Sequence, residues 1–144
     1  MPHRSSVTRQ HGAPHRPRTN SPLGAREIIA FIATSDPGRA KVFYRDTLGL
    51  ALQNEDRFAM VFDACGTMLR VTTVHEVAAA GYTVLGWRVP DIDIAVRDLQ
   101  AAGVKFDRYP GMPQDERGIW KAPSGAQIAW FKDPDGNTLS ITEF

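Results

Sequence analysis

The sequence is poor in the residues that build metal sites and disulfides. Cys65 is the only cysteine among 144 residues, so neither an internal disulfide nor a thiolate metal cage can form. His3, His11 and His15 lie in the first 26 residues, which leaves His75 as the only histidine of the remaining chain. Because only one histidine is left, a site built from several histidines is almost excluded. No apolar run approaches the roughly 18 residues of a membrane span.

Acidic residues are missing from the start of the chain. Residues 1–26 contain five arginines and no acid, whereas residues 27–144 hold the other 12 basic residues and all 16 acidic ones, so the net charge of +1 describes neither part. The first segment lacks the apolar core of a secretory signal and is interrupted by prolines. We expect a basic, disordered tail over residues 1–26 and a cytoplasmic location. Nucleic-acid binding is not favoured, because no aromatic residue is interleaved with the arginines.

The rest of the chain alternates between strand-like runs and helices. A strand is predicted over residues 28–34, followed by a helix that Asp36 caps, Pro37 begins and Gly49 ends. A strand over residues 84–89 and a helix between Asp91 and Gly103 repeat this order. The other predicted strands are residues 51–54, 57–63, 67–73, 104–109, 118–122, 127–132 and 138–142.

The second half of this region repeats the first. Residues 34–36 correspond to residues 89–91 at an offset of 55, and residues 66–72 correspond to residues 136–142 at an offset of 70. The pattern predicts one α+β domain over residues 27–144, made of two βαβββ modules at about 27–80 and 81–144. Their strands are expected to form a curved mixed sheet with a central cleft and with the helices outside.

Three motifs in this order resemble one known family. The run Ser35–Gly49, with its Asp36, Phe43-Tyr44 and Leu48-Gly49, resembles the helix signature of the vicinal oxygen chelate superfamily. This superfamily includes glyoxalase I, bleomycin-resistance proteins and extradiol dioxygenases. Residues 89–93 are similar to the strand end and helix cap of its second module, and residues 131–137 to its last hairpin. The resemblance implies the duplicated fold over residues 27–144 and a functional site in the cleft.

The resemblance also implies where a divalent metal would be held, at two strand positions per module. In this chain these positions hold Ile29 and Arg70 in the first module and Val84 and Ser140 in the second. Isoleucine and valine have no donor atom, serine is a poor ligand unless ionised, and an arginine places a permanent positive charge where the cation would sit. We therefore predict neither a metal nor another cofactor.

Strand alternation predicts which side chains share the cleft with these four positions. Phe31 lies two residues from Ile29, and pairing across the hairpin turns adds Met60, Phe62 and Trp130. The predicted ligand-binding residues are Phe31, Met60, Arg70, Arg88, Trp130 and Ser140. Arg70 would bind a carboxylate or phosphate through two donors, while the aromatic residues and Met60 would pack on an apolar, flat part of the ligand.

Several of these residues have a second interpretation that the sequence leaves open. Arg70 could pair with an internal acid, and Trp130 could belong to the core. His75-Glu76 is more typical of a surface pair than of a catalytic one. The two aspartates at 133 and 135 are typical turn formers. The proline-rich insertion at residues 110–124 is interpreted as a lid over the cleft or a dimer contact.

Three functions follow from these residues. The leading hypothesis is a metal-independent protein of the glyoxalase/bleomycin-resistance type that binds or sequesters a small apolar, anionic molecule. The alternative is a lyase, isomerase or dioxygenase with a displaced metal site near His75 and Glu76, or with metal-free acid–base chemistry. The third is a subunit whose cleft a partner occupies, with Tyr109, Met112 and Trp120 at the interface. A homodimer is expected, because the two modules leave sheet edges to cover.

Overall fold

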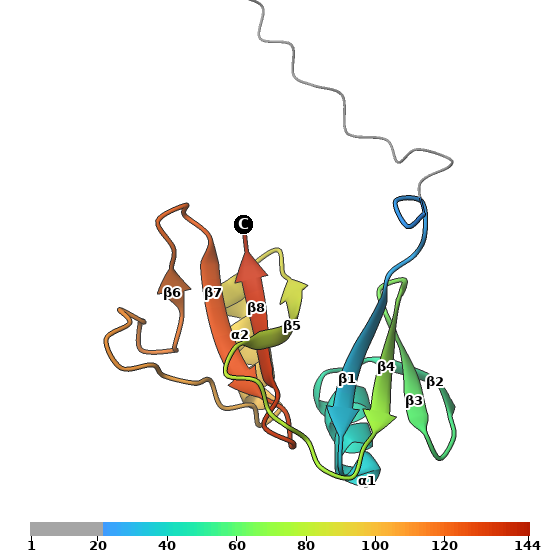
Figure 1. Cartoon of the computed structure of the whole chain (residues 1–144). Helices are drawn as coiled ribbons and strands as arrows, with labels where there is room; N and C mark the ends of the chain where they lie inside the picture. The colour runs from blue at the N-terminus through green and yellow to red at the C-terminus, as the bar shows by residue number, and fades with distance from the viewer. Residues whose placement is uncertain (1–21) are drawn as a thin grey trace, which may run out of the picture.

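A computed structural model describes residues 22–144 of the chain (Figure 1). The predicted tail lies mostly outside these residues and stays a prediction. The elements, in chain order, are β1 (Ile29–Thr34), α1 (Pro37–Lys41), the π-helix η1 (Val42–Thr47), β2 (Ala51–Glu55), β3 (Ala59–Ala64), β4 (Thr67–Thr73), β5 (Thr83–Arg88), α2 (Ile92–Ala101), β6 (Trp120–Lys121), β7 (Gln127–Lys132) and β8 (Thr138–Glu143). None of the helices formed by residues 22–144 is long and apolar enough to span a bilayer.

The strands form two four-stranded mixed sheets with the same topology. The first has the order β1-β4-β3-β2 and the second the order β5-β8-β7-β6. In each sheet the strand before the helix pairs in parallel with the last strand of its module, and the other pairs are antiparallel. Figure 1 shows the sheets side by side, with β1 and β5 as the neighbouring strands. The predicted α+β fold of two βαβββ modules is confirmed.

Both predicted helix caps are present. The side chain of Asp36 accepts a hydrogen bond from Arg39 N at 3.2 Å, and that of Asp91 accepts one from Ile94 N at 3.1 Å. The first helix does not stay an α-helix, however, because it widens into a π-helix after Lys41. This widened turn is a feature that helical spacing alone does not predict.

One predicted strand is wrong. Residues 104–109 form no strand and contribute only a single bridge between Phe106 and Phe131. Asp107 N still donates to Trp130 O of β7 at 2.8 Å, but Tyr109 N donates to the side chain of Gln114 at 2.7 Å, so the pairing with β7 does not continue. The strand expected at residues 118–122 is shortened to β6, because backbone groups at its start bond to the insertion instead. Ile119 O accepts from Asp115 N, and Gly118 O accepts from the side chain of Gln114.

The first hairpin shifts two predicted cleft residues to the opposite face. Cys65 and Gly66 form a two-residue turn with φ of 50° and 91°, so Ala64 pairs with Thr67. In this register Arg70 is opposite Val61, not Met60. The placement of Met60 and Phe62 in the cleft is therefore wrong. Their side chains are buried in the core, with Met60 only 2% exposed.

One hydrophobic core extends through both modules on the helix side of the sheets. The predicted core faces are confirmed, with Leu69 and Val71 from β4 and Leu139 and Ile141 from β8 buried in it. Aromatic contacts connect the modules, since the rings of Phe43 and Phe131 lie 6.4 Å apart. The opposite face of each sheet carries the other predicted cleft residues. We call it the open face, defined by Ile29, Phe31, Met68 and Arg70 in the first sheet and by Val84, Gly86, Arg88, Trp130 and Ser140 in the second.

The turn between β7 and β8 fastens the second module to the first. Tyr44 of η1 donates its hydroxyl to Asp133 Oδ2 at 2.6 Å, and Thr34 at the end of β1 donates to Asp135 Oδ2 at 2.6 Å. Asn137 Nδ2 adds bonds to Asp133 Oδ2 at 2.8 Å and to Ala33 O at 2.9 Å. Burial and the neighbouring Asp133 raise the pKa of Tyr44 far above its usual value, so its hydroxyl remains a donor.

Candidate functional site

The open face of the first sheet carries an arginine without a partner. Arg70 lies opposite Phe31 in the β1–β4 ladder and is half-buried. Its side chain forms no hydrogen bond or ion pair with any residue of the range 22–144. Its charge acts on Asp56, whose pKa is lowered by hydrogen bonds from Phe58 N and Ala59 N and, to a smaller extent, by the charge of Arg70. The guanidinium donors are thus available to an external anion.

Large apolar side chains surround Arg70 on this face and remain in contact with solvent. Phe31 is 61% exposed, Ile29 47% and Met68 40%. The neighbouring Val84 of β5 is 38% exposed. An apolar row around one unpaired cation is suited to a ligand that has an apolar body and an anionic group.

The open face of the second sheet forms a pocket of about 280 Å³ beside Trp130. The indole Nε1 donates to Thr83 Oγ1 at 3.1 Å, which fixes the orientation of the ring. Tyr109 meets the ring edge-on, with centroids 5.6 Å apart and planes at 88°. The pocket is lined by Gly81, Tyr82, Thr83, Tyr109, Met112, Trp130 and Thr138, all from the second module and the segment that precedes it. Trp130 is therefore a pocket wall, not a core residue.

The insertion forms one wall of this pocket and is held by its own hydrogen bonds. Gln114 Nε2 donates to Asp107 O at 2.9 Å and to Gly118 O at 2.8 Å, while its oxygen accepts from Tyr109 N. The side chain of Asp115 accepts from Arg117 N and Ile119 N, both at 2.9 Å. These bonds place Tyr109 and Met112 against Trp130.

A charged pair lies at the edge of the same pocket. Lys132 Nζ donates to Asp107 Oδ2 at 2.7 Å and lies 3.5 Å from the hydroxyl of Tyr109. Partial burial lowers the pKa of Lys132, but the bond to Asp107 outweighs this effect and the pKa is above its usual value. Lys132 is thus a fixed positive charge, compensated by Asp107, on the rim of an aromatic pocket.

The four positions implied for a metal do not fit one. Ile29 and Val84 offer no donor atom, and Arg70 presents a cation on the same face. Ser140 is buried and lies against Gly86, where a Cβ atom would come within 2.7 Å of its Oγ. Within residues 22–144, no three His, Cys, Asp or Glu side chains are grouped closely enough to share an ion.

The other predicted site residues are not all brought together. Phe31 and Arg70 form one group, and Trp130 and Ser140, paired in the β7–β8 ladder, form a second on the other sheet. Arg88 lies at the far end of β5, where its guanidinium stacks over Phe144 at 5.2 Å. The exposed His75 and Glu76 follow β4. Sequence reasoning missed Tyr82, which precedes β5, and Thr83, its first residue. The signal for them was the offset of 55, at which Thr83 corresponds to Ile28.

Comparison with known proteins agrees with this architecture. Residues 27–141 match the family described as Glyoxalase/Bleomycin resistance protein/Dioxygenase superfamily. No curated protein matches the chain.

Similar solved structures cover nearly the whole fold. Lactoylglutathione lyase from Agrobacterium tumefaciens has a TM-score of 0.64 at 18% identity and covers 82% of this chain and 93% of its own. A glyoxalase family protein from Enterococcus faecalis has a TM-score of 0.65 at 20% identity, covering 83% and 98%. A superfamily member from Sphaerobacter thermophilus has a TM-score of 0.59 at 24% identity, covering 81% and 97%. At these identities the likeness concerns the fold alone.

Proposed function

Because the chain belongs to the glyoxalase/bleomycin resistance protein/dioxygenase superfamily, we propose that its open face binds a small apolar molecule with an anionic group, and does so without a metal. The observation that carries this proposal is the unpaired guanidinium of Arg70 beside the exposed ring of Phe31. A guanidinium that forms no hydrogen bond or ion pair within residues 22–144, set in an apolar surface, favours a carboxylate or phosphate attached to an apolar body.

The second sheet supplies the complementary half of such a site. Trp130, Tyr109 and Met112 offer a flat, polarisable wall for a planar molecule. Ser140 and Thr138 of β8 add hydroxyl groups on the same face of the second sheet. The identity of the side chains at positions 29, 70, 84 and 140 supports binding that needs no metal.

We further propose that a second copy of the chain covers the open face. Four large apolar side chains are exposed on this face of one protomer, namely those of Ile29, Phe31, Met68 and Val84. A patch of this kind on a soluble surface marks an interface or a ligand site. Within one chain, the Arg70 group and the Trp130 group lie on separate sheets. Association through this face would bring the Arg70 group of one protomer towards the Trp130 group of its partner.

The ligand proposal is tested with a matched pair of arginine variants. Native mass spectrometry of the purified protein identifies any co-purified molecule, and 2-naphthoate serves as a defined anionic aromatic probe. Arg70→Ala should weaken 2-naphthoate binding at least tenfold while the far-ultraviolet circular dichroism stays unchanged. Arg57→Ala, at an exposed arginine stacked on Phe58, should leave it unchanged. Unaltered affinity of the Arg70 variant would refute the role of this residue.

Metal analysis separates this function from the enzymatic alternative. Stoichiometric Ni, Zn, Mn or Fe in the purified protein, lost on His75→Ala, would replace the proposal by a displaced metal site.

The dimer is tested by sedimentation equilibrium. Phe31→Asp should dissociate it, whereas Val42→Asp, at a helical position that is 53% exposed against 61% for Phe31, should not. A monomeric wild-type protein at micromolar concentration contradicts the proposed association.

A further inference from the structure

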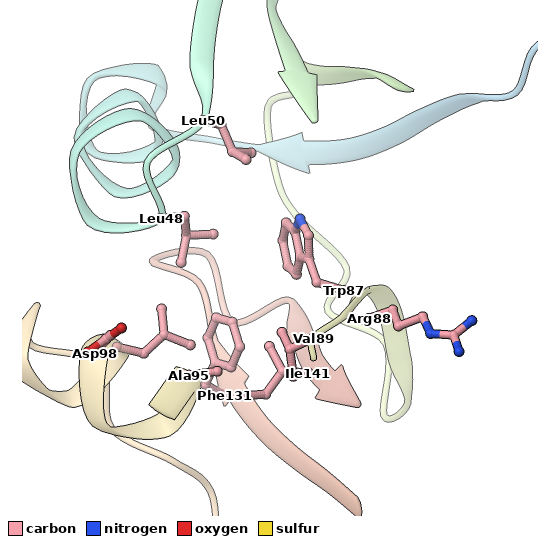
Figure 2. A pocket seen from close by; sticks show the side chains of 10 residues that line it. Leu48, Leu50, Trp87, Arg88, Val89, Ala95, Asp98, Phe131 and Ile141 are labelled. Atoms are coloured by element: carbon pink, nitrogen blue, oxygen red, sulfur yellow. The ribbon is translucent and has the colours of Figure 1, made fainter. Parts of the chain in front are cut away.

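A second cavity lies on the opposite side of the sheets, where the two modules meet. This junction pocket has a volume of about 280 Å³ and lies between the end of η1, helix α2 and the core face of the second sheet (Figure 2). Leu48 and Leu50 of the first module form one side, and Trp87 and Phe131 of the second module face them (Figure 2). Neither strand periodicity nor the family resemblance predicts a cavity here.

The junction pocket is separate from the open face. Trp87 pairs with Ile141 on the core side of the β5–β8 ladder, while the adjacent pairs Gly86–Ser140 and Arg88–Thr142 point to the open face. The pocket beside Trp130 shares no lining residue with the junction pocket. A molecule bound at the junction would therefore leave the proposed ligand site free.

The hydrogen bonds between the modules keep this pocket open. Tyr44 and Asp133 hold η1 against the second module at a fixed spacing. Gly49, with φ of 77°, then turns the chain, and Leu50 N donates back to Tyr44 O at 2.9 Å. The backbone of the leucine wall is fixed by these contacts, so it cannot collapse onto Trp87, and the cavity is largely preformed.

The lining determines which molecules fit. Apart from backbone groups, the polar residues at the pocket are Arg88 and Asp98. Figure 2 shows the Arg88 side chain directed away from the cavity, where it stacks over Phe144, and Asp98 at one end. Asp98 is exposed and lies 3.6 Å from Arg97. Neither of these two charged side chains, the only ones among the pocket-lining residues of the described part of the chain, is directed into the interior, so an ion inside would be desolvated without compensation.

From this lining we infer that the junction pocket is a second ligand site, which takes an uncharged aromatic molecule about the size of two fused six-membered rings. The rings of Trp87 and Phe131 provide aromatic contacts, and the two leucines close the opposite side. The size follows from the volume, since apolar cavities of about 150 Å³ hold one benzene ring. The site does not depend on the function proposed for the open face.

Naphthalene tests the inference on the full-length chain. Titration followed by ¹H–¹⁵N correlation spectra should shift, saturably, the backbone signals of Leu48 and Leu50 and the indole signal of Trp87. The unfolding temperature should rise with naphthalene concentration, because the molecule binds the folded state. Ala95→Leu, which fills the pocket from α2 with a good helix former, should weaken binding at least tenfold.

Matched controls make the result specific to this site. Arg57→Ala, at an exposed arginine that lines neither pocket, should leave the naphthalene affinity unchanged. The concentration of 2-naphthoate needed to shift the junction signals should be at least tenfold higher than that of naphthalene. If Ala95→Leu fails to fold, Leu48→Phe fills the same cavity from the other module. Absence of shifts at the junction, or a folded filled variant that binds naphthalene equally well, overturns the inference. Junction signals that change with protein concentration alone would show a second copy there and would also overturn it.

Discussion

The hydroxyl of Tyr44 donates to Asp133 Oδ2 at 2.6 Å across a sequence separation of 89 residues. The bond connects the π-helix of the first module with the last hairpin of the second. Asp133 is buried and receives further bonds from Asn137 and from the backbone of its own turn. A single polar cluster therefore holds the two modules together inside an otherwise apolar core.

Tyr44→Phe should destabilise the domain. The variant keeps the ring against Phe62 but removes one donor from a buried carboxyl group. Hydrogen bonds to such groups are worth about 1.5–3 kcal/mol, so a loss of about 2 kcal/mol in the free energy of unfolding is expected. Urea denaturation measures it. Tyr82→Phe, at a tyrosine 71% exposed, should change stability by less than about 0.5 kcal/mol. Equal effects of both variants would contradict the importance of the bond.

Asp135 should make the free energy of unfolding of the domain depend on pH. Partial burial raises the pKa of Asp135, but hydrogen bonds from Thr34 and Ser35 outweigh burial and hold the pKa below its usual value. The unfolded state therefore binds the proton more readily. The contribution is fully present above about pH 4, near the unfolded pKa, and is lost as the pH falls through the lower folded-state pKa.

Asp135→Asn tests this dependence. The variant should be less stable than the wild type at pH 7, and the difference should shrink as urea midpoints are measured towards pH 3. Asp98→Asn, on an exposed part of α2, serves as the control. A difference that stays constant over the whole range would show that the ionisation of Asp135 makes no contribution.

Gly86→Ala should introduce a local clash on the open face. A Cβ atom at this position would approach Ser140 Oγ to 2.7 Å and Ser140 O to 3.4 Å. Overpacking of this kind costs about 1–3 kcal/mol. Removing the hydroxyl in Gly86→Ala/Ser140→Ala should recover most of that loss, since only the backbone oxygen remains close. Thermal unfolding of the wild type, both single variants and the double variant measures the coupling, and strictly additive effects would argue against the contact.

Met60→Ala should reduce stability without a specific effect on ligand binding. The side chain is 2% exposed in the core, so truncation leaves a cavity that costs about 2–5 kcal/mol. Val61→Ala, at the position opposite Arg70, should cost less and should alter 2-naphthoate affinity instead. Isothermal titration of folded samples distinguishes the two positions. A Met60 variant that remained stable but lost the probe would restore the original assignment to the ligand face.

The sequence was sufficient to predict the elements and most of the strand faces. Two copies of one pattern fixed the module order, and Asp36 and Asp91 marked both helix starts. Strand alternation placed Phe31 and Arg70 on one face correctly, because the side-chain period of a strand is two residues. The second hairpin also followed this rule, with Trp130 opposite Ser140.

The first hairpin could not be placed, because its register depends on the length of the turn. A two-residue turn at Cys65-Gly66 requires a left-handed conformation at both positions, and cysteine rarely adopts it. A change of one residue in the turn moves the whole strand to the other face, which is why Met60 was misassigned. The hydrogen bonds of Asp133 and Asp135 to the first module could not be predicted from the sequence either. Both are ordinary turn residues locally, and their partners lie about 90 and 100 residues away.

The exposed Cys65 at this turn gives the chain a natural attachment point for spectroscopy. It is the only thiol in the sequence, and the next residue, Gly66, lines a hollow with Ile29 and Met68 at the end of the open face. A maleimide fluorophore or nitroxide bound there labels one defined position without any mutation. Distances between two such labels in a mixed sample would report directly on whether, and in which orientation, two protomers meet.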